Sequence, residues 1–259
     1  MKAAVYFGPQ DIRCTTIPDS VLRADHEVLV KVTATSICGS DLHMYRGVLD
    51  GIMDKGKSQT GHELIGEVLE TGKAVGRFKK GDRISMGYSA SCGDCYMCKV
   101  GQTAHCETTQ KAVYGFGVPF GNLNGTHAET LVLPHADGHA IKVPAEISDR
   151  AAITLSCNLP SAVIANELAN IKVGETVAVI GCGPSGLMAM DIAIHRGPGR
   201  LVAIDTLPQR LAVAARKGAT PIDSSHEGWK QQALEVTGGR GFDKIIEMVG
   251  LPETLQMSL

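Results

Sequence analysis

Four cysteines with metal-binding spacing occur in one irregular stretch of the chain, Cys92, Cys95, Cys98 and Cys106. Four thiolates in a short loop can surround one tetrahedral zinc ion, and four protein ligands leave no open position for a substrate. The sequence therefore predicts a structural zinc site. The main alternative is an iron–sulfur cluster. The cysteine run of bacterial ferredoxins ends C-x3-C-P, whereas here seven residues separate Cys98 from Cys106 and Glu107 follows. Disulfides or free thiols are the remaining possibility.

A second set of possible ligands is scattered along the chain and comprises Cys38, His62 and Cys157. Two thiolates and an imidazole form a three-ligand zinc set, which leaves a fourth position open for water or substrate. A lone histidine or cysteine is more commonly a core or surface residue than a ligand. The case for this ligand set therefore depends on the motifs around it, and a small buried residue is the alternative for Cys157.

A glycine-rich loop is the third candidate site. Residues 181–186 read G-C-G-P-S-G, which matches G-x-G-x-x-G. The loop follows a predicted strand, Thr176–Ile180, and opens a predicted helix, Pro184–Arg196, which is the context that dinucleotide binding requires. Free N–H groups and the positive end of the helix dipole would face the phosphates there.

Each residue of this loop has an expected role in cofactor binding. Gly181 would make the tight turn, Gly183 would let the pyrophosphate approach, and Gly186 would let the helix pack on the sheet. Pro184 suits the first helical position, where its missing N–H would be unpaired anyway. Ser185 completes the motif.

The next predicted strand, Leu201–Ile204, ends at Asp205. A carboxylate there can accept both ribose hydroxyls of NAD and would repel the 2′-phosphate of NADP. The sequence therefore predicts NAD as the cofactor. Arg210 could lie over the adenine as a stacking plane, and an ordinary surface arginine is the alternative.

Two kinds of scaffold would position these residues. Up to about residue 150 the chain is typical of β-structure, with strands predicted at 27–33, 62–69, 83–85 and 130–133 and a long irregular stretch from 89 to about 123. Afterwards strands (176–180, 201–204, 219–222, 244–249) alternate with helices (184–196, 208–217, 227–237), which predicts a parallel sheet with crossover helices. We expect a β-rich domain over residues 1–150 and a dinucleotide-binding α/β domain over residues 151–259.

Length and composition narrow the class of protein. The 259 residues suffice for two domains, and 44% apolar against 20% charged residues is globular. A formal charge of -2 argues against nucleic acid or an anionic membrane as the main partner. No secretory signal opens the sequence, so a cytoplasmic location is expected, where eight cysteines favour metal binding over disulfides. Cys14 is expected to be a half-buried strand residue.

Together the motifs resemble zinc-dependent medium-chain alcohol dehydrogenases. The resemblance runs through the whole chain in order, with C-G-S-D-x-H at 38–43, G-H-E at 61–63, the four cysteines and the glycine loop. It is most similar to the bacterial branch of formaldehyde, sorbitol and threonine dehydrogenases. The resemblance implies a GroES-like β-rich catalytic domain followed by a Rossmann domain, one catalytic and one structural zinc ion, and NAD.

The resemblance also assigns roles. The catalytic zinc ligands would be Cys38, His62 and Cys157. Glu63 matches the glutamate that sits behind the metal and can exchange onto it, and Asp41 matches the carboxylate that orients the ligand histidine. Ser40 would accept the alcohol proton and His43 would pass it to solvent. Ser161 keeps a hydroxyl expected near the nicotinamide, although Pro160-Ser161-Ala162 departs from the Pro-Thr-Gly common in bacterial relatives.

The expected reaction is reversible transfer of a hydride between an alcohol or polyol and NAD. The alternatives are a metal-free, NADPH-dependent enzyme similar to quinone reductases and a non-enzymatic protein that binds zinc and NAD. The expected partners are a small alcohol or aldehyde and further copies of the chain, as a dimer or tetramer. A six-stranded dinucleotide fold needs two more βα units, so the sequence is expected to belong to a longer protein; a smaller four-stranded domain is the alternative.

Overall fold

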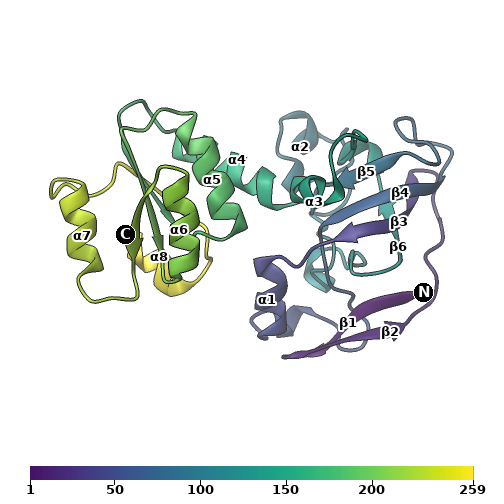
Figure 1. Cartoon of the computed structure of the whole chain (residues 1–259). Coiled ribbons are helices and arrows are strands. Elements are labelled where there is room, and N and C mark those ends of the chain that lie inside the picture. The colour runs from purple at the N-terminus through teal and green to yellow at the C-terminus, as the bar shows by residue number, and fades with distance from the viewer. Residues whose placement is uncertain (259) are drawn as a thin grey trace. The chain divides into compact units, whose positions relative to one another are not determined.

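The computed structural model describes residues 1–258, which form two compact units that meet at the Cys157–Asn158 bond (Figure 1). The sequence placed this change between residues 150 and 151. The observed division falls later because helix α3 (Asp149–Ala152) and the turn after it belong to the first unit. There Ala152 is packed with Ile65 and Val143 in one small core cluster.

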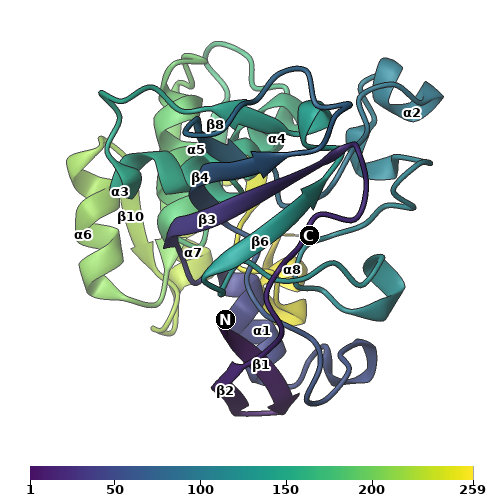
Figure 2. The same cartoon turned by 90° about the vertical axis from the view of Figure 1, so that its right-hand side faces the viewer.

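Antiparallel β-structure dominates the first unit. Five strands lie side by side in the order β6-β3-β4-β5-β7, and Figure 2 shows β3, β4 and β6 adjacent to one another. Their bounds are β3 (Glu27–Thr35), β4 (Leu64–Thr71), β5 (Arg83–Met86), β6 (Thr130–Pro134) and β7 (Ala140–Lys142). The strand predicted at 27–33 is confirmed as β3, and its side chains alternate, because Val28 and Val30 are fully buried while Lys31 is exposed.

Several elements of this unit were not predicted. They are the hairpin of β1 (Lys2–Gly8) and β2 (Asp11–Thr16), strand β7, helix α1 (Gly39–Tyr45), helix α2 (Tyr96–Lys99) and helix α3. The expectation for Cys14 was wrong in part: it lies in strand β2, but its side chain is exposed. The hairpin has few strongly alternating residues, so its position depends on pairing rather than on local pattern.

The predicted irregular stretch contains no strand between residues 89 and 123. It holds α2 and two short 3-10 turns, Thr103–His105 and Val118–Phe120. Other 3-10 turns are Asp50–Ile52, Ala136–Gly138 and Ile153–Leu155. A loop of this length needs an internal anchor, and the four cysteines lie inside it.

The second unit contains a parallel four-stranded sheet in the order β10-β9-β8-β11. Its strands are β8 (Thr176–Ile180), β9 (Arg200–Asp205), β10 (Thr220–Asp223) and β11 (Lys244–Glu247), and its helices are α4 (Asn158–Ala169), α5 (Pro184–Ile194), α6 (Pro208–Arg216), α7 (Trp229–Val236) and α8 (Pro252–Met257). Taken in chain order, the strands are arranged 3-2-1-4, as in the first part of a Rossmann sheet. The predicted parallel sheet with crossover helices is confirmed.

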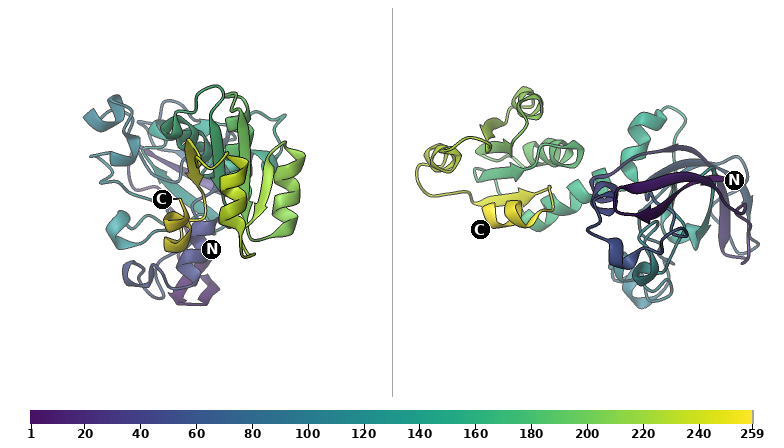
Figure 3. Two further views of the ribbon diagram at one scale, coloured as in Figure 1. Left: turned by 90° about the vertical axis from the view of Figure 1, so that its left-hand side faces the viewer. Right: turned by 90° about the horizontal axis from the view of Figure 1, so that it is seen from below.

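Helices cover both faces of this sheet (Figures 1 and 3). Val177 and Val179 of β8 point to the face packed by α4, α5 and α6, whereas Ala178 and Ile180 point to the face packed by α7 and α8. Because successive side chains of a strand alternate in direction, one apolar strand serves two cores. Helix α4 was not predicted. No helix within residues 1–258 has the length and apolar character needed to cross a membrane.

Candidate active site

The three scattered ligands meet in the first unit. Cys38 precedes helix α1, His62 comes just before strand β4, and Cys157 follows the turn after α3. Their ligand atoms, together with a carboxylate oxygen of Glu63, all lie within 4.8 Å of one another. Figure 2 shows β3 and β4 side by side, and these strands bring the segments before α1 and β4 together. The structure thus gathers four donors from three separate segments.

Asp41 connects two of these donors. Its Oδ2 accepts a hydrogen bond from the backbone N–H of Cys38 at 2.8 Å, which fixes the start of α1. Its Oδ1 lies 3.4 Å from Nδ1 of His62. Asp41 and His62 are both buried, and neither Oδ1 nor Nδ1 has a well-aligned hydrogen-bond partner among the described residues. The pair is placed for Nδ1–H to face the carboxylate while Nε2 faces the ligand cluster.

The cluster perturbs the acidity of its members. A hydrogen bond from the Cys157 thiol, opposed by burial and assisted by His62, lowers the pKa of Cys38. Burial opposes charge on His62, but Asp41 and Cys38 outweigh it and raise the pKa of His62 to about 10. Burial is the main cause that raises the pKa of Glu63 to about 7. Shifts of this kind are typical of functional sites.

The donor set fits a zinc ion. Thiolates at Zn–S distances of about 2.3 Å around a tetrahedral ion lie roughly 3.8 Å apart, which is compatible with the observed cluster. Two thiolates and an imidazole are borderline-soft ligands that zinc prefers. Nδ1 of His62 lies beside the Asp41 carboxylate. Metal-bound histidines usually have such an acceptor next to the ring nitrogen that does not bind the metal. Zinc would therefore be held by Cys38, His62 and Cys157, with Glu63 next to them.

Ser40 and His43, the predicted proton-relay residues, both lie on helix α1. Oγ of Ser40 is 3.3 Å from Nε2 of His62, so this hydroxyl borders the ligand cluster. His43 follows one turn later and is half-buried. Residues three apart occupy the same side of a helix, which places both side chains along one edge of α1.

The four cysteines of the long loop also converge. Sγ atoms of Cys92 and Cys98 are 4.0 Å apart, and those of Cys95 and Cys106 are 3.8 Å apart. These separations are close to the edge of a zinc tetrathiolate and far beyond a disulfide bond. Backbone N–H groups of Cys92, Asp94 and Cys95 point at the sulfurs. The arrangement favours a closed metal site over disulfides, and His105 beside it is exposed.

The glycine loop, in the second unit, connects β8 to α5. Gly181 has a φ of +89°, a conformation that suits glycine. A methyl group at Gly186 would lie 1.8 Å from the carbonyl oxygen of Gly181, so only glycine fits there. A methyl group at Gly183 would meet nothing within 4 Å. Pro184 occupies the first helical position, and Ser185 bonds to Asn158 of α4 at 2.7 Å.

Asp205 lies at the end of β9, next to this loop. Its Oδ2 accepts the N–H of Cys182 at 2.7 Å and its Oδ1 accepts the N–H of Leu207 at 2.9 Å. The exposed Arg210 places Nη1 3.7 Å from Oδ2. Burial first and the Asp205 charge second raise the pKa of the Cys182 thiol to about 12, so Cys182 remains neutral. Ser161, on α4, is half-buried.

Sequence reasoning missed two residues that support the metal-ligand cluster. Ser36 donates a hydrogen bond to Oε2 of Glu63, and the imidazole of His127 bonds to the backbone carbonyl of Ser36 at 3.0 Å. Neither residue belongs to a motif. The one available signal was the position of Ser36, two residues before Cys38.

Comparison with known proteins identifies the family. Residues 24–145 match the profile of the alcohol dehydrogenase GroES-like domain, and residues 184–259 match that of the zinc-binding dehydrogenases. A medium chain reductase/dehydrogenase of an Acremonium species is 36% identical over 96% of this chain and 86% of its own length. This chain belongs to the zinc-binding medium-chain alcohol dehydrogenase family.

Two further members of the family illustrate the likeness. Sorbitol dehydrogenase of Bacillus subtilis is 33% identical over 100% of this chain and 71% of its own length. The solved structure of an alcohol dehydrogenase from a Thermus species superimposes with a TM-score of 0.89 at 34% identity, and covers 100% of this chain and 73% of the Thermus chain. The curated relatives are covered over 60% to 86% of their length. The GroES-like and Rossmann-like fold class is confirmed.

Proposed function

We propose that this chain carries the catalytic and nucleotide-binding parts of a zinc-dependent oxidoreductase, which transfers a hydride between a primary or secondary alcohol, or a polyol, and NAD. The observation that carries the proposal is the convergence of Cys38, His62, Glu63 and Cys157 within 4.8 Å. A metal-free reductase would have no use for two thiolates and an imidazole at one point. Membership of the zinc-binding dehydrogenase family supports the same assignment.

The chain's own residues would divide the work as follows. Cys38, His62 and Cys157 would hold the catalytic zinc, and Asp41 would keep the His62 ring oriented through Nδ1. Bound zinc would supply a Lewis acid that lowers the pKa of an alcohol, and bound nicotinamide would supply the hydride acceptor. Ser40 borders the cluster and accepts the hydroxyl proton of the alcohol. His43, one helical turn further, passes this proton to solvent.

The glycine loop would supply the cofactor site. Gly183 leaves room for the pyrophosphate at the start of α5, where free N–H groups and the helix dipole favour phosphate. Asp205 favours NAD because its carboxylate can accept ribose hydroxyls and repels a 2′-phosphate. Arg210 would flank the adenine, and Ser161 would lie near the nicotinamide. The four-cysteine cluster would hold a second, structural zinc ion.

The wider setting is also a proposal. We infer a cytoplasmic, homo-oligomeric enzyme that acts on a small alcohol or aldehyde, without a nucleic-acid or membrane partner. The near-neutral formal charge of -2 supports the absence of a polyanionic partner.

Zinc content and activity of matched cysteine variants test this function. The protein should bind two zinc ions per chain and form NADH from at least one member of a panel of alcohols and polyols. Cys38→Ser should lose one zinc ion and turnover, whereas Cys14→Ser, at an exposed cysteine outside both clusters, should retain both. Full activity of Cys38→Ser, or activity with NADPH that persists after a chelator removes all metal, would overturn the proposal.

A further inference from the structure

Glu63 occupies an unusual position beside the proposed catalytic zinc ligands. It is 1% exposed, and its Oε1 lies 3.9 Å from Nε2 of His62. Its other oxygen, Oε2, accepts a hydrogen bond from the hydroxyl of Ser36. A buried carboxylate next to a cation either coordinates the cation or is held by other donors. The Ser36 hydroxyl is such a donor, so its hydrogen bond affects whether Glu63 stays off the metal.

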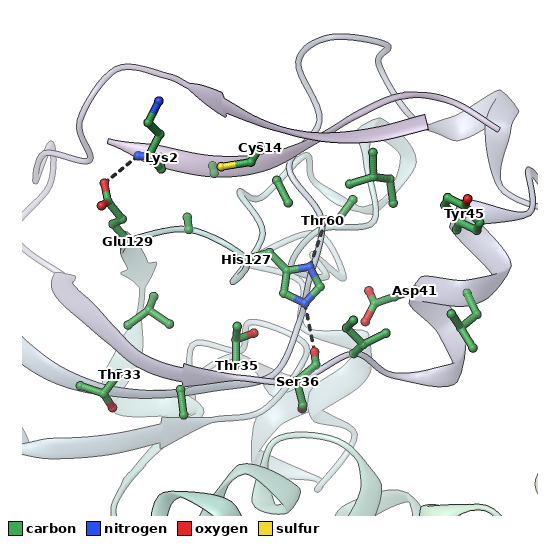
Figure 4. A pocket seen from close by; sticks show the side chains of 18 residues that line it. Lys2, Cys14, Thr33, Thr35, Ser36, Asp41, Tyr45, Thr60, His127 and Glu129 are labelled. Carbon is green, nitrogen blue, oxygen red and sulfur yellow. Dashed lines mark hydrogen bonds between the residues drawn. The ribbon is translucent and has the colours of Figure 1, made fainter. Parts of the chain in front are cut away.

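Ser36 is itself held firmly in place. Nε2 of His127 donates to the backbone carbonyl of Ser36 at 3.0 Å, and Nδ1 of the same ring accepts from Oγ1 of Thr60 at 3.0 Å (Figure 4). A carbonyl can only accept, which assigns the ring proton to Nε2. Gly61 leaves room for this ring, since a methyl group there would lie 2.6 Å from it.

The residues of this chain of hydrogen bonds come from different segments. Ser36 follows strand β3, whereas Thr60 precedes strand β4 and His127 precedes strand β6. Ser36, Asp41 and His127 all line a cavity of about 920 Å³ in the first unit, as Figure 4 shows. Asp41 supports His62 from this side, and Ser36 supports Glu63. The two side chains thus hold two neighbouring members of the ligand cluster.

We propose that Ser36 is a positioning residue that holds the Glu63 carboxylate beside the metal rather than on it, and so keeps the fourth coordination position open for substrate. This inference rests on the proposed function, because it requires zinc at Cys38, His62 and Cys157. Without the Ser36 hydroxyl, Oε2 of Glu63 lacks this donor, and the bound cation is the strongest nearby replacement. The carboxylate then competes with the alcohol for one position.

Ser36→Ala tests the inference on the metal-loaded protein, with Thr35→Val as a matched control. Thr35 donates to the backbone carbonyl of Glu63 at 2.8 Å, so its replacement removes a hydroxyl from the same residue's surroundings without touching the carboxylate. With cobalt in place of zinc, Ser36→Ala should change the position and intensity of the d–d absorption of the open site. The closed four-cysteine site in the same spectrum is an internal reference.

Two solution measurements accompany the spectrum. Release of metal from the open site to a chelator should slow about tenfold in Ser36→Ala, because the Glu63 carboxylate would add a fourth protein ligand; loss of affinity, the usual effect of removing an outer partner, would instead speed release. The KM for the alcohol should rise more than kcat falls, because the Glu63 carboxylate competes with substrate for the same coordination position. Ser36→Thr, which keeps the hydroxyl, should restore the wild-type spectrum, and Thr35→Val should resemble wild type throughout.

The outcomes separate this inference from the proposed function. If the wild-type protein binds no cobalt or zinc at the open site, the proposed function fails. If the wild-type protein binds metal there but Ser36→Ala leaves the spectrum and the release rate unchanged, the role of Ser36 is overturned while the function stands. Equal changes in Ser36→Ala and Thr35→Val would also overturn it, because they would reflect general loosening of the site.

Discussion

The carboxylate of Asp205 accepts a hydrogen bond from the backbone N–H of Cys182 across 2.7 Å, so the end of β9 is tied to the glycine loop. The other carboxylate oxygen accepts the N–H of Leu207. Asp205 therefore holds the glycine loop in place, and under the proposed function the same carboxylate would select the cofactor.

Replacing Asp205 with glycine should reverse the cofactor preference. The variant loses the ribose acceptor and the charge that repels a 2′-phosphate, so NAD should bind at least about tenfold more weakly and NADP more tightly. Loss of the two backbone hydrogen bonds should also lower the free energy of unfolding by roughly 1–3 kcal/mol. Fluorescence titration with both cofactors and denaturant unfolding measure these effects. An unchanged preference would show that Asp205 does not face the ribose.

Two glycines of the loop should respond differently to alanine. Gly183→Ala places a methyl group in open space, so stability should be kept while NAD affinity falls, because the methyl group enters the space expected for the pyrophosphate. Gly186→Ala forces a methyl group against the carbonyl of Gly181 and should lose both stability and affinity. Thermal unfolding and NAD titration of the pair distinguish them. If Gly183→Ala binds NAD normally, the pyrophosphate lies elsewhere.

Removal of the predicted structural zinc should loosen the long irregular loop. Cys106 is fully buried and supplies one of the four sulfurs of the cluster. Cys106→Ser should therefore release one zinc ion and leave the second. Hydrogen exchange should then accelerate about residues 89–123, with smaller changes in the parallel sheet of the second unit. Mass spectrometry of exchange with zinc analysis tests this. Unchanged protection of the loop would show that the cluster does not anchor it.

His139 should make the protein sensitive to mild acid. Burial lowers its pKa from 6.5 to about 4, although the backbone carbonyls of Ser91 and His135 beside Nδ1 oppose this shift. In the neutral ring, Nε2 accepts the hydroxyl of Tyr114 at 2.9 Å. The unfolded chain binds a proton at about pH 6.5, whereas the folded protein does not until about pH 4. The contribution of His139 to the free energy of unfolding is therefore fully present above about pH 6.5. It decreases by roughly 3 kcal/mol as the pH falls to about 4.

His139→Gln checks this pH dependence, since an amide can keep both hydrogen bonds but does not titrate. Denaturant unfolding across the window should show a flatter dependence than wild type. His195→Gln, at an exposed histidine, serves as the control and should keep the wild-type slope. Equal slopes in wild type and His139→Gln would assign the acid sensitivity to other groups.

The sequence by itself determined the features that depend on short-range spacing. The G-x-G-x-x-G loop between β8 and α5 has local geometry that glycines and a first-turn proline enforce. The four cysteines in one loop can meet because little chain separates them. The strands of the second unit and its helices α5, α6 and α7 were predictable because apolar periodicity and turn residues act locally.

Only the tertiary structure decided which distant residues meet. Cys38, His62 and Cys157 share a site because strands β3 and β4 pair and α3 packs back on the first unit, and no local pattern encodes those long-range contacts. The bond between Ser36 and Glu63, and the support of Ser36 by His127, were equally invisible in the sequence. Serine and histidine have many possible partners, so the packing of separate segments alone determines which partner each one finds.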